Sequence, residues 1–330
     1  MLGRMTDFRT IQTNGISMRI AEAGEGPLVV LCHGFPESWY SWRHQLPALA
    51  AAGYHAVAPD MRGYGGSDAP EAIEAYDIFH LTGDMVGLLD ALGEEQAVIV
   101  GHDWGSVVAW DAALFRPDRF RAVVGMSVPY FPRLPVRPTE AMKAAAGDRF
   151  MYILYFQEPG KAEAELDPDP ERVHRMFLCG ISGSAAKGRG WNTDIPKTGR
   201  FLDSLREPEK IPDWLTQDDI LYYANEFKPR GFRGGLNWYR NFDRNWELLA
   251  PFADARVRVP ACFIGGLRDP VVTGPELEGE GPGVAALASF CDDLRSKVLI
   301  EGAGHWNQQE KPDETNAALL GFLADLDSPG

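Results

Sequence analysis

Cysteine is scarce in this sequence, and the few cysteines are scattered. There are 4 in 330 residues, and none belongs to a CxxC pair. That spacing argues against the usual zinc-binding patterns and against a disulfide framework. We therefore expect Cys32, Cys179, Cys262 and Cys291 to be free thiols, buried or half-buried in the fold.

Basic residues and long apolar runs are also in short supply. Lysine and arginine total 32 against 47 aspartates and glutamates, a formal net charge of −15, and a surface of that sign repels nucleic-acid phosphates and anionic lipids. No run of about 18 apolar residues is present to span a bilayer, and residues 1–10 lack the apolar segment of a signal peptide. We expect no nucleic-acid or membrane partner, and a cytoplasmic location.

The first third of the chain alternates short apolar runs with helical stretches. This alternation is typical of βαβ units around a largely parallel sheet. Strands are expected at residues 27–32, 55–58, 97–100 and 122–127. Each run ends in a loop rich in functional side chains, and open α/β sheets bind ligands at the carboxyl ends of their strands. The chemistry should therefore lie in these loops.

The strand pattern then stops for more than a hundred residues. Aromatic, glycine, proline and charged residues mix at helical spacing, as in residues 149–157 and 217–227. Between these two stretches, residues 180–199 have the composition of a surface loop. We predict that residues 130–246 form an inserted helical cap.

The strand pattern returns near the end of the chain. Two further strands are expected at residues 260–265 and 297–300, before a last helix at residues 313–326. The predicted core is therefore split between residues 1–129 and 247–330. Its fold class is α/β, with a mostly parallel central sheet flanked by helices.

The segment GHDWG at residues 101–105 lies directly after an expected strand and before an expected helix at residues 106–115. Its glycines permit the sharp turn of a nucleophile elbow, which raises the central side chain beside a helix N-terminus. Asp103 occupies the central position, where serine is usual. His102 points elsewhere in such a turn, so we expect a structural role for it.

An aspartate at the centre of the elbow selects the reaction class. A carboxylate is ionised at neutral pH. It attacks a saturated carbon rather than a carbonyl, which leaves an ester whose carbonyl belongs to the enzyme. Water must then attack that carbonyl, so the second half of the reaction needs a base and an oxyanion hole. Asp103 is the expected nucleophile.

The candidates for the base and its partner follow the last two strands. His305 lies in the sequence GAGHW, and the chain order nucleophile, acid, histidine agrees with this fold class. Asp269 follows the strand at residues 260–265 and can hold the imidazole in one tautomer. An alternative position for the acid, in residues 128–133, contains no carboxylate. We predict His305 as the base and Asp269 as its orienting acid.

The tetrapeptide HGFP at residues 33–36 follows the first expected strand. A loop at this position supplies backbone N–H groups to a developing oxyanion. We expect the N–H groups of Phe35 and Trp104 to form the oxyanion hole.

These motifs resemble those of a known family. HGFPESWYSWR (33–43), DMRGYGGSD (60–68), GHDWGS (101–106) and GAGHW (302–306) are similar to the epoxide hydrolases of the α/β-hydrolase superfamily, the soluble epoxide hydrolases and their bacterial relatives. The resemblance extends over about residues 9–326. It implies the α/β-hydrolase fold with an inserted helical cap, and neither a metal nor an organic cofactor.

Two segments of the expected cap, YILYFQEPG from residue 152 and RGFRGGLNWYRN from residue 230, are similar to those that carry the family's cap tyrosines. By that correspondence the pair is Tyr152 and Tyr239, with Tyr155 as the alternative for the first. The chemistry agrees, because opening an epoxide generates an alkoxide that two phenolic O–H groups can stabilise or protonate.

Trp39, Trp104 and Trp238 are candidates for the walls of an apolar substrate pocket. Aromatic walls would desolvate the carboxylate that attacks a neutral epoxide. For Trp39 and Trp238, packing in the core is an equally good interpretation.

The combined prediction is an epoxide hydrolase that converts an apolar epoxide and water to a vicinal diol. A haloalkane or haloacid dehalogenase is the first alternative, because it shares the aspartate elbow. Halide release needs N–H donors, however, and this chain offers tyrosines in both cap segments. A ligand-binding receptor with the same fold is the alternative from another class, disfavoured because Asp103, Asp269 and His305 are all present.

Overall fold

The computed structural model describes residues 6–185, 191–192, 194–273 and 279–327. Its centre is an 8-stranded sheet in the order β1-β2-β4-β3-β5-β6-β7-β8. The strands are β1 (Asp7–Thr13), β2 (Ile16–Ala23), β3 (Leu28–Cys32), β4 (His55–Pro59), β5 (Ala97–His102), β6 (Phe120–Met126), β7 (Ala261–Gly266) and β8 (Leu294–Ile300). The six strands expected from the sequence are all present.

The six strands from β3 to β8 are parallel to one another. Parallel strands covered on both faces are continuous apolar runs, and β3, with the sequence LVVLC, is buried at every position. The predicted mostly parallel sheet of the α/β-hydrolase fold is therefore confirmed.

The chain starts with a hairpin that was not predicted from the sequence. β1 and β2 pair antiparallel, and β2 pairs antiparallel with β4. Asn14 and Gly15 form the turn with φ of 43° and 79°, and Asn-Gly is the most favourable pair for a two-residue hairpin with positive φ at both positions.

Helices cover both faces of the sheet. They are α1 (Gln45–Ala51), α2 (Ile78–Leu92), α3 (Trp104–Phe115), α4 (Pro138–Ala146), α5 (Tyr152–Phe156), α6 (Lys161–Leu166), α7 (Pro170–Gly180), α8 (Gln217–Phe227), α9 (Arg233–Arg240), α10 (Phe242–Leu248), α11 (Pro270–Thr273), α12 (Pro282–Ala286), α13 (Asn307–Glu310) and α14 (Pro312–Asp327), with short 3₁₀ turns η1 (Trp39–Trp42), η2 (Ile73–Tyr76), η3 (Leu202–Ser204), η4 (Ala250–Phe252) and η5 (Leu287–Ser289). Helices α2 and α3 pack in one apolar cluster and α1 and α14 in a second.

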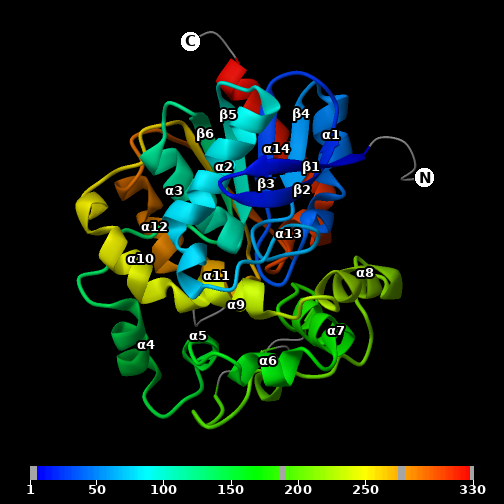
Figure 1. Ribbon diagram of the computed structural model, residues 1–330, viewed down its shortest axis with the longest axis vertical. Coiled ribbons are helices and arrows are strands. Elements are labelled where there is room, and N and C mark those ends of the chain that lie inside the picture. The colour runs from blue at the N-terminus through cyan, green and yellow to red at the C-terminus, as the bar shows by residue number, and fades with distance from the viewer. Residues whose placement is uncertain (1–5, 186–190, 193, 274–278, 328–330) are drawn as a thin grey trace.

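The described part of the chain between β6 and β7 contains helices and no strand of the sheet. Helices α4 to α8 lie together beside the core, at the bottom of Figure 1. The predicted helix at residues 217–227 is α8, whereas the one expected at residues 149–157 is shortened to α5, because Pro159 and Gly160 follow closely. The division into a core and a cap at residues 130 and 246 stays a prediction.

The prediction of a surface loop at residues 180–199 is wrong for its first part. Ile181 and Ser182 are each only 4% exposed. They pack beneath the loop of His305, whose N–H donates to the Ile181 carbonyl at 3.0 Å. Residues 186–190 and 193 of the expected loop lie outside the described residues.

All four cysteines are buried free thiols, as expected. In the described ranges, no helix combines the length and apolar character needed to cross a membrane. The same ranges contain no cluster of three or more histidine, cysteine or acidic side chains arranged to hold a metal.

Candidate active site

Asp103 sits on a strained turn between β5 and α3. Its φ and ψ are 53° and −120°, a backbone conformation that costs free energy for a residue with a side chain. The turn is possible because two glycines flank it. A Cβ on Gly101 would lie 1.9 Å from the Gly105 carbonyl oxygen, and one on Gly105 would lie 2.0 Å from that of Cys32.

The two carboxylate oxygens of Asp103 have different surroundings. Oδ1 accepts a hydrogen bond from the Phe35 N–H at 2.9 Å. Oδ2 lies 3.4 Å from Nε2 of His305. Gly34 allows this approach, because a Cβ there would lie 2.4 Å from Oδ1. One oxygen is thus held by a backbone donor, while the other faces a titratable imidazole.

Trp104, the other expected oxyanion donor, is the first residue of α3. In the described structure its N–H makes no hydrogen bond to the Asp103 carboxylate. The structure therefore brings Phe35 into contact with Asp103, and leaves the Trp104 N–H next to it at the helix N-terminus.

His305 is paired with Asp269. Its Nδ1 lies 3.0 Å from Oδ2 of Asp269, and the two residues are 2% and 0% exposed. Burial lowers the pKa of His305, but the negative charges of Asp269 and Asp103 outweigh burial and hold that pKa well above its usual value. The imidazole is therefore a cation at neutral pH.

A buried network fixes the backbone of His305. Its carbonyl accepts hydrogen bonds from Nε2 of His102 at 2.7 Å and from Oγ of Ser127 at 2.8 Å. The other ring nitrogen of His102 lies 2.8 Å from Oε2 of Glu37. His102 thus has the structural role that the elbow implied. The roles of Glu37 and Ser127 were not predicted from the sequence. Only for Glu37 was there a signal, its position directly after HGFP.

Two tyrosines face Asp103 across one cavity. Tyr152 on α5 and Tyr239 on α9 both line the space that Asp103 and Trp104 border, and their ring centroids are 5.9 Å apart. Burial and the negative charge of Asp103 raise the pKa of both phenols. Both tyrosines therefore keep their protons over the working range of an enzyme and can donate them.

Tyr155, the alternative to Tyr152, does not line this cavity. Its hydroxyl donates to Oε2 of Glu165 at 2.9 Å. The geometry thus favours Tyr152 as the first cap tyrosine.

Known proteins resemble this chain closely. Residues 27–159 match the family described as alpha/beta hydrolase fold. Epoxide hydrolase A of Mycobacterium tuberculosis (strain ATCC 25618 / H37Rv) is 51% identical over 97% of this chain and 98% of its own length. The chain belongs to the epoxide hydrolase family.

Solved structures of epoxide hydrolases agree with this membership. The crystal structure of epoxide hydrolase A from Mycobacterium thermoresistibile has 53% identity and a TM-score of 0.90, and the match covers 97% of this chain and 98% of that one. An epoxide hydrolase from an endophytic Streptomyces has 44% identity and a TM-score of 0.93, over 98% of this chain and 96% of that one.

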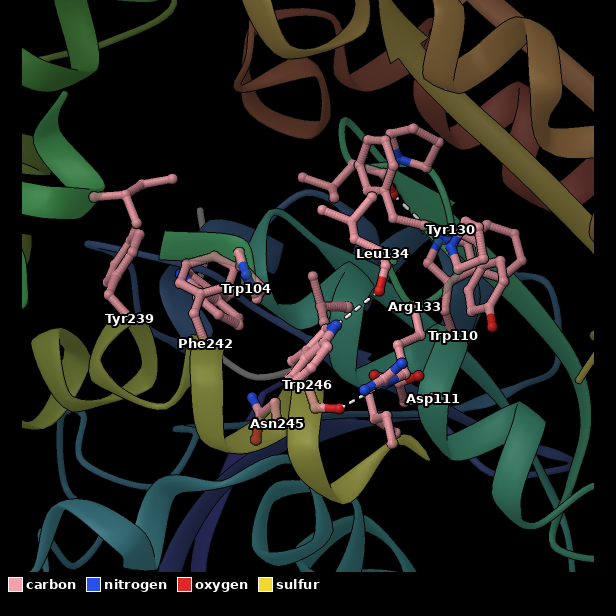
Figure 2. Close-up of a pocket in the computed structure, with 18 of the residues that line it drawn as sticks. Trp104, Trp110, Asp111, Tyr130, Arg133, Leu134, Tyr239, Phe242, Asn245 and Trp246 are labelled. Carbon is pink, nitrogen blue, oxygen red and sulfur yellow. Dashed lines mark hydrogen bonds between the residues drawn. The ribbon is translucent and has the colours of Figure 1, made fainter. Parts of the chain in front are cut away.

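The cavity of this epoxide hydrolase has a volume of about 380 Å³ and mostly apolar walls (Figure 2). Besides Asp103, Trp104, Tyr152 and Tyr239, its walls are formed by Val107, Trp110, Asp111, Leu114, Val128, Pro129, Tyr130, Phe131, Pro132, Arg133, Leu134, Pro138, Met142, Ile153, Phe242, Asn245, Trp246, Leu249, Phe252 and Val271. Most of these residues come from α3, α10 and the segment after β6, which no sequence motif had marked.

Two of the three expected pocket tryptophans lie elsewhere. Trp39 donates its indole N–H to the Tyr222 hydroxyl at 2.8 Å and packs edge-on against Phe8. Trp238 is 1% exposed and donates to the Arg62 carbonyl at 3.0 Å. Neither lines the cavity, so their role is packing, and Trp104 alone of the three borders Asp103.

Proposed function

We propose that this enzyme hydrolyses an apolar epoxide to a vicinal diol in two steps, through an ester on Asp103. The observation that carries the proposal is the arrangement of Asp103, which borders one apolar cavity together with two tyrosines and lies beside a charged imidazole. No metal or organic cofactor takes part in the proposed steps.

In the first step Oδ2 of Asp103 forms a bond to a ring carbon of the epoxide, and the bond between that carbon and the ring oxygen breaks. Oδ2 is the oxygen for this attack because Oδ1 is held by the Phe35 N–H. The electron pair of the broken bond goes to the ring oxygen, which takes up a proton with Tyr152 and Tyr239 as donors. The product is a hydroxyalkyl ester.

Formation of the ester prepares the second step. Asp103 loses its negative charge when it is esterified, so one of the two charges that raise the pKa of His305 disappears. The imidazole can then release its proton, which restores the tyrosine that protonated the ring oxygen, and act as a base, with Asp269 still holding the tautomer through Nδ1. The nucleophile thus keeps the base inactive until the ester exists.

In the second step His305 removes a proton from water as that water attacks the carbonyl carbon of the Asp103 ester. The electron pair moves to Oδ1, where the Phe35 N–H, which already contacts this oxygen, stabilises the oxyanion. Collapse of the tetrahedral intermediate breaks the bond between the ester carbon and the alkoxy oxygen, which takes the proton of the added hydroxyl group, so that the diol leaves and the Asp103 carboxylate is restored. His305 keeps the proton taken from water and is again the cation with which the reaction began.

The experiment compares the two reactions that an aspartate elbow permits. The enzyme is incubated with styrene oxide and, separately, with 1-chlorobutane, and the release of diol and of chloride is followed. We expect diol from the epoxide and no chloride. Chloride release without diol would instead identify a dehalogenase, and neither product would favour a non-catalytic receptor.

A cytoplasmic location stays part of the proposal. The four free cysteines support it, because free thiols persist in a reducing compartment.

A further inference from the structure

One face of α3 forms a wall of the cavity. Trp104, Val107, Asp111 and Leu114 all border the cavity, and their spacing of three or four residues puts them on the same side of the helix. With a rise of 1.5 Å per residue, Asp111 is about 12 Å further along the helix than Asp103. The cavity is thus long enough to hold a chain between these two carboxyl groups.

Asp111 is a buried acidic residue in this mostly apolar wall. It is only 7% exposed, and in the described part of the protein no hydrogen bond or ion pair engages its carboxyl group. Burial raises the pKa of Asp111 to about 7. Buried carboxyl groups almost always have a partner, so this one is suited to a partner that enters the cavity.

Tyr130 provides a second polar group at the same end. The residue is 5% exposed, and its hydroxyl has no hydrogen-bond partner among the described residues. Burial and, after it, the charge of Asp111 raise the pKa of Tyr130, so the two groups are near each other. Figure 2 shows both at the end of the cavity away from Tyr239.

The other side chains at this end of the cavity are apolar or already hydrogen-bonded within the protein. Arg133 donates from Nε to the Trp246 carbonyl at 2.7 Å, and its guanidinium lies 3.8 Å from the centroid of the Trp246 ring. Leu114 and Leu134 add aliphatic surface. Asp111 and Tyr130 are therefore the groups available here to recognise a polar ligand.

We propose that Asp111 and Tyr130 form a distal subsite that binds a hydroxyl group of the substrate, at the far end of a chain whose epoxide lies against Asp103. This inference rests on the proposed function. A hydroxyl group fits because it can accept a hydrogen bond from a neutral carboxyl group and donate one to an ionised carboxylate. An ammonium group is disfavoured because the apolar walls desolvate it, and a carboxylate by the same cost and by the charge of Asp111.

The test uses terminal epoxides of matched length that end in a methyl, hydroxyl, ammonium or carboxylate group. Diol formation is measured at pH 8 for the wild type and for Asp111→Leu, Asp111→Asn and Tyr130→Phe. In the wild type we expect kcat/KM to be about tenfold higher for the hydroxyl-ended epoxide than for the methyl-ended one, mainly through KM. The carboxylate-ended epoxide should be the poorest substrate.

The variants should change these preferences in different ways. Asp111→Leu should abolish the hydroxyl preference, so that the hydroxyl-ended and methyl-ended epoxides have kcat/KM values within about twofold of each other. Tyr130→Phe should reduce the preference about threefold. Asp111→Asn, which keeps the size of the side chain, should remove the discrimination against the carboxylate. The surface variant Asp118→Asn, just beyond α3, is the control and should keep the wild-type pattern.

Three results would overturn the inference. They are equal rates for the methyl- and hydroxyl-ended epoxides in the wild type, a hydroxyl preference that survives Asp111→Leu, and a preference for the ammonium-ended epoxide. Each is distinct from failure of the proposed function, in which the wild type would form no diol from the methyl-ended epoxide either.

Discussion

The loops of the sheet and the helices beside it hold their reactive side chains in different ways. Asp103 and His305 lie where backbones approach closely and where hydrogen bonds are numerous. Oδ1 of Asp103 contacts the Phe35 N–H, and the carbonyl of His305 accepts two hydrogen bonds. Charged groups that must meet a reacting atom are thus fixed by directional contacts.

The tyrosines are held mainly by aromatic packing. The ring of Tyr239 lies edge-on to Phe35 and Phe156, with centroids 5.4 Å and 5.2 Å away. The ring of Tyr152 lies 5.2 Å from that of Trp191. Packing sets the position of a ring with less precision than hydrogen bonds do. We therefore expect changes on the sheet side to stop the reaction and changes on the helix side to slow it.

The largest effect is expected for Asp103→Ala. This change removes the nucleophile, so kcat for styrene oxide should fall by at least about 10⁴-fold. Initial rates of diol formation measure the loss, and circular dichroism checks that the variant is folded. A folded variant that kept a hundredth of the activity would show that Asp103 does not carry the first step.

Next in size is the pH dependence of stability that Asp111 causes. Burial raises its pKa from 3.8 to about 7, so the stability it contributes is present at acid pH and is lost as pH rises through about 7. Replacing Asp111 by Asn removes this loss, so the variant should gain about 3 kcal/mol relative to the wild type between pH 5 and pH 8.

Urea denaturation at the two pH values measures this gain, and Asp118→Asn at an exposed site provides the control. A difference between Asp111→Asn and the wild type that does not change with pH would mean that Asp111 is ionised in the folded protein at pH 5. That result would remove one support of the distal subsite.

A smaller effect is expected for the tyrosines. Tyr152→Phe and Tyr239→Phe should each lower kcat about 10²-fold, because each removes one of two donors to the ring oxygen. Tyr155→Phe is the matched control on α5 and should stay within about threefold of the wild type, since its hydroxyl is bound to Glu165. A loss as large for Tyr155→Phe as for Tyr152→Phe would reverse the assignment.

The smallest effect is expected where α9 crosses the core. A Cβ on Gly234 would lie 2.1 Å from the Gly63 carbonyl oxygen, so Gly234→Ala should push α9 away and cost about 1 to 3 kcal/mol of stability. Gly321 in α14 has open space around it, and Gly321→Ala should stabilise the protein by up to about 1 kcal/mol. Thermal unfolding compares the stability of the two variants with that of the wild type. Equal destabilisation by both would contradict the close contact between Gly234 and Gly63.

The elbow and the His305 loop could be predicted because their sequences are dictated by the local backbone. Only glycine fits at residues 101 and 105, and this requirement is visible in the sequence itself. The same holds for the position of Asp269 after β7, since a strand end fixes where the next side chain lies. The first hairpin was not predicted although Asn14 and Gly15 mark its turn, because β1 is exposed at most of its positions and has no continuous apolar run.

The walls of the cavity could not be predicted in the same way. Trp238 and Tyr239 are neighbours in the sequence, but successive helical residues point in different directions. Trp238 therefore donates to the Arg62 carbonyl, whereas Tyr239 lines the cavity that Asp103 borders. Asp111 sits in an apolar helix with nothing in the sequence to mark it. Which face of a helix borders a cavity is decided by packing between distant segments.

The most direct test of the ester mechanism is the intact mass of His305→Gln after incubation with styrene oxide. This variant can form the ester but lacks the base that activates water, so the ester should accumulate. We predict a mass gain equal to the whole epoxide, located on the peptide that contains Asp103 and absent in the double variant with Asp103→Ala. No adduct, or an adduct that persists without Asp103, would contradict the account.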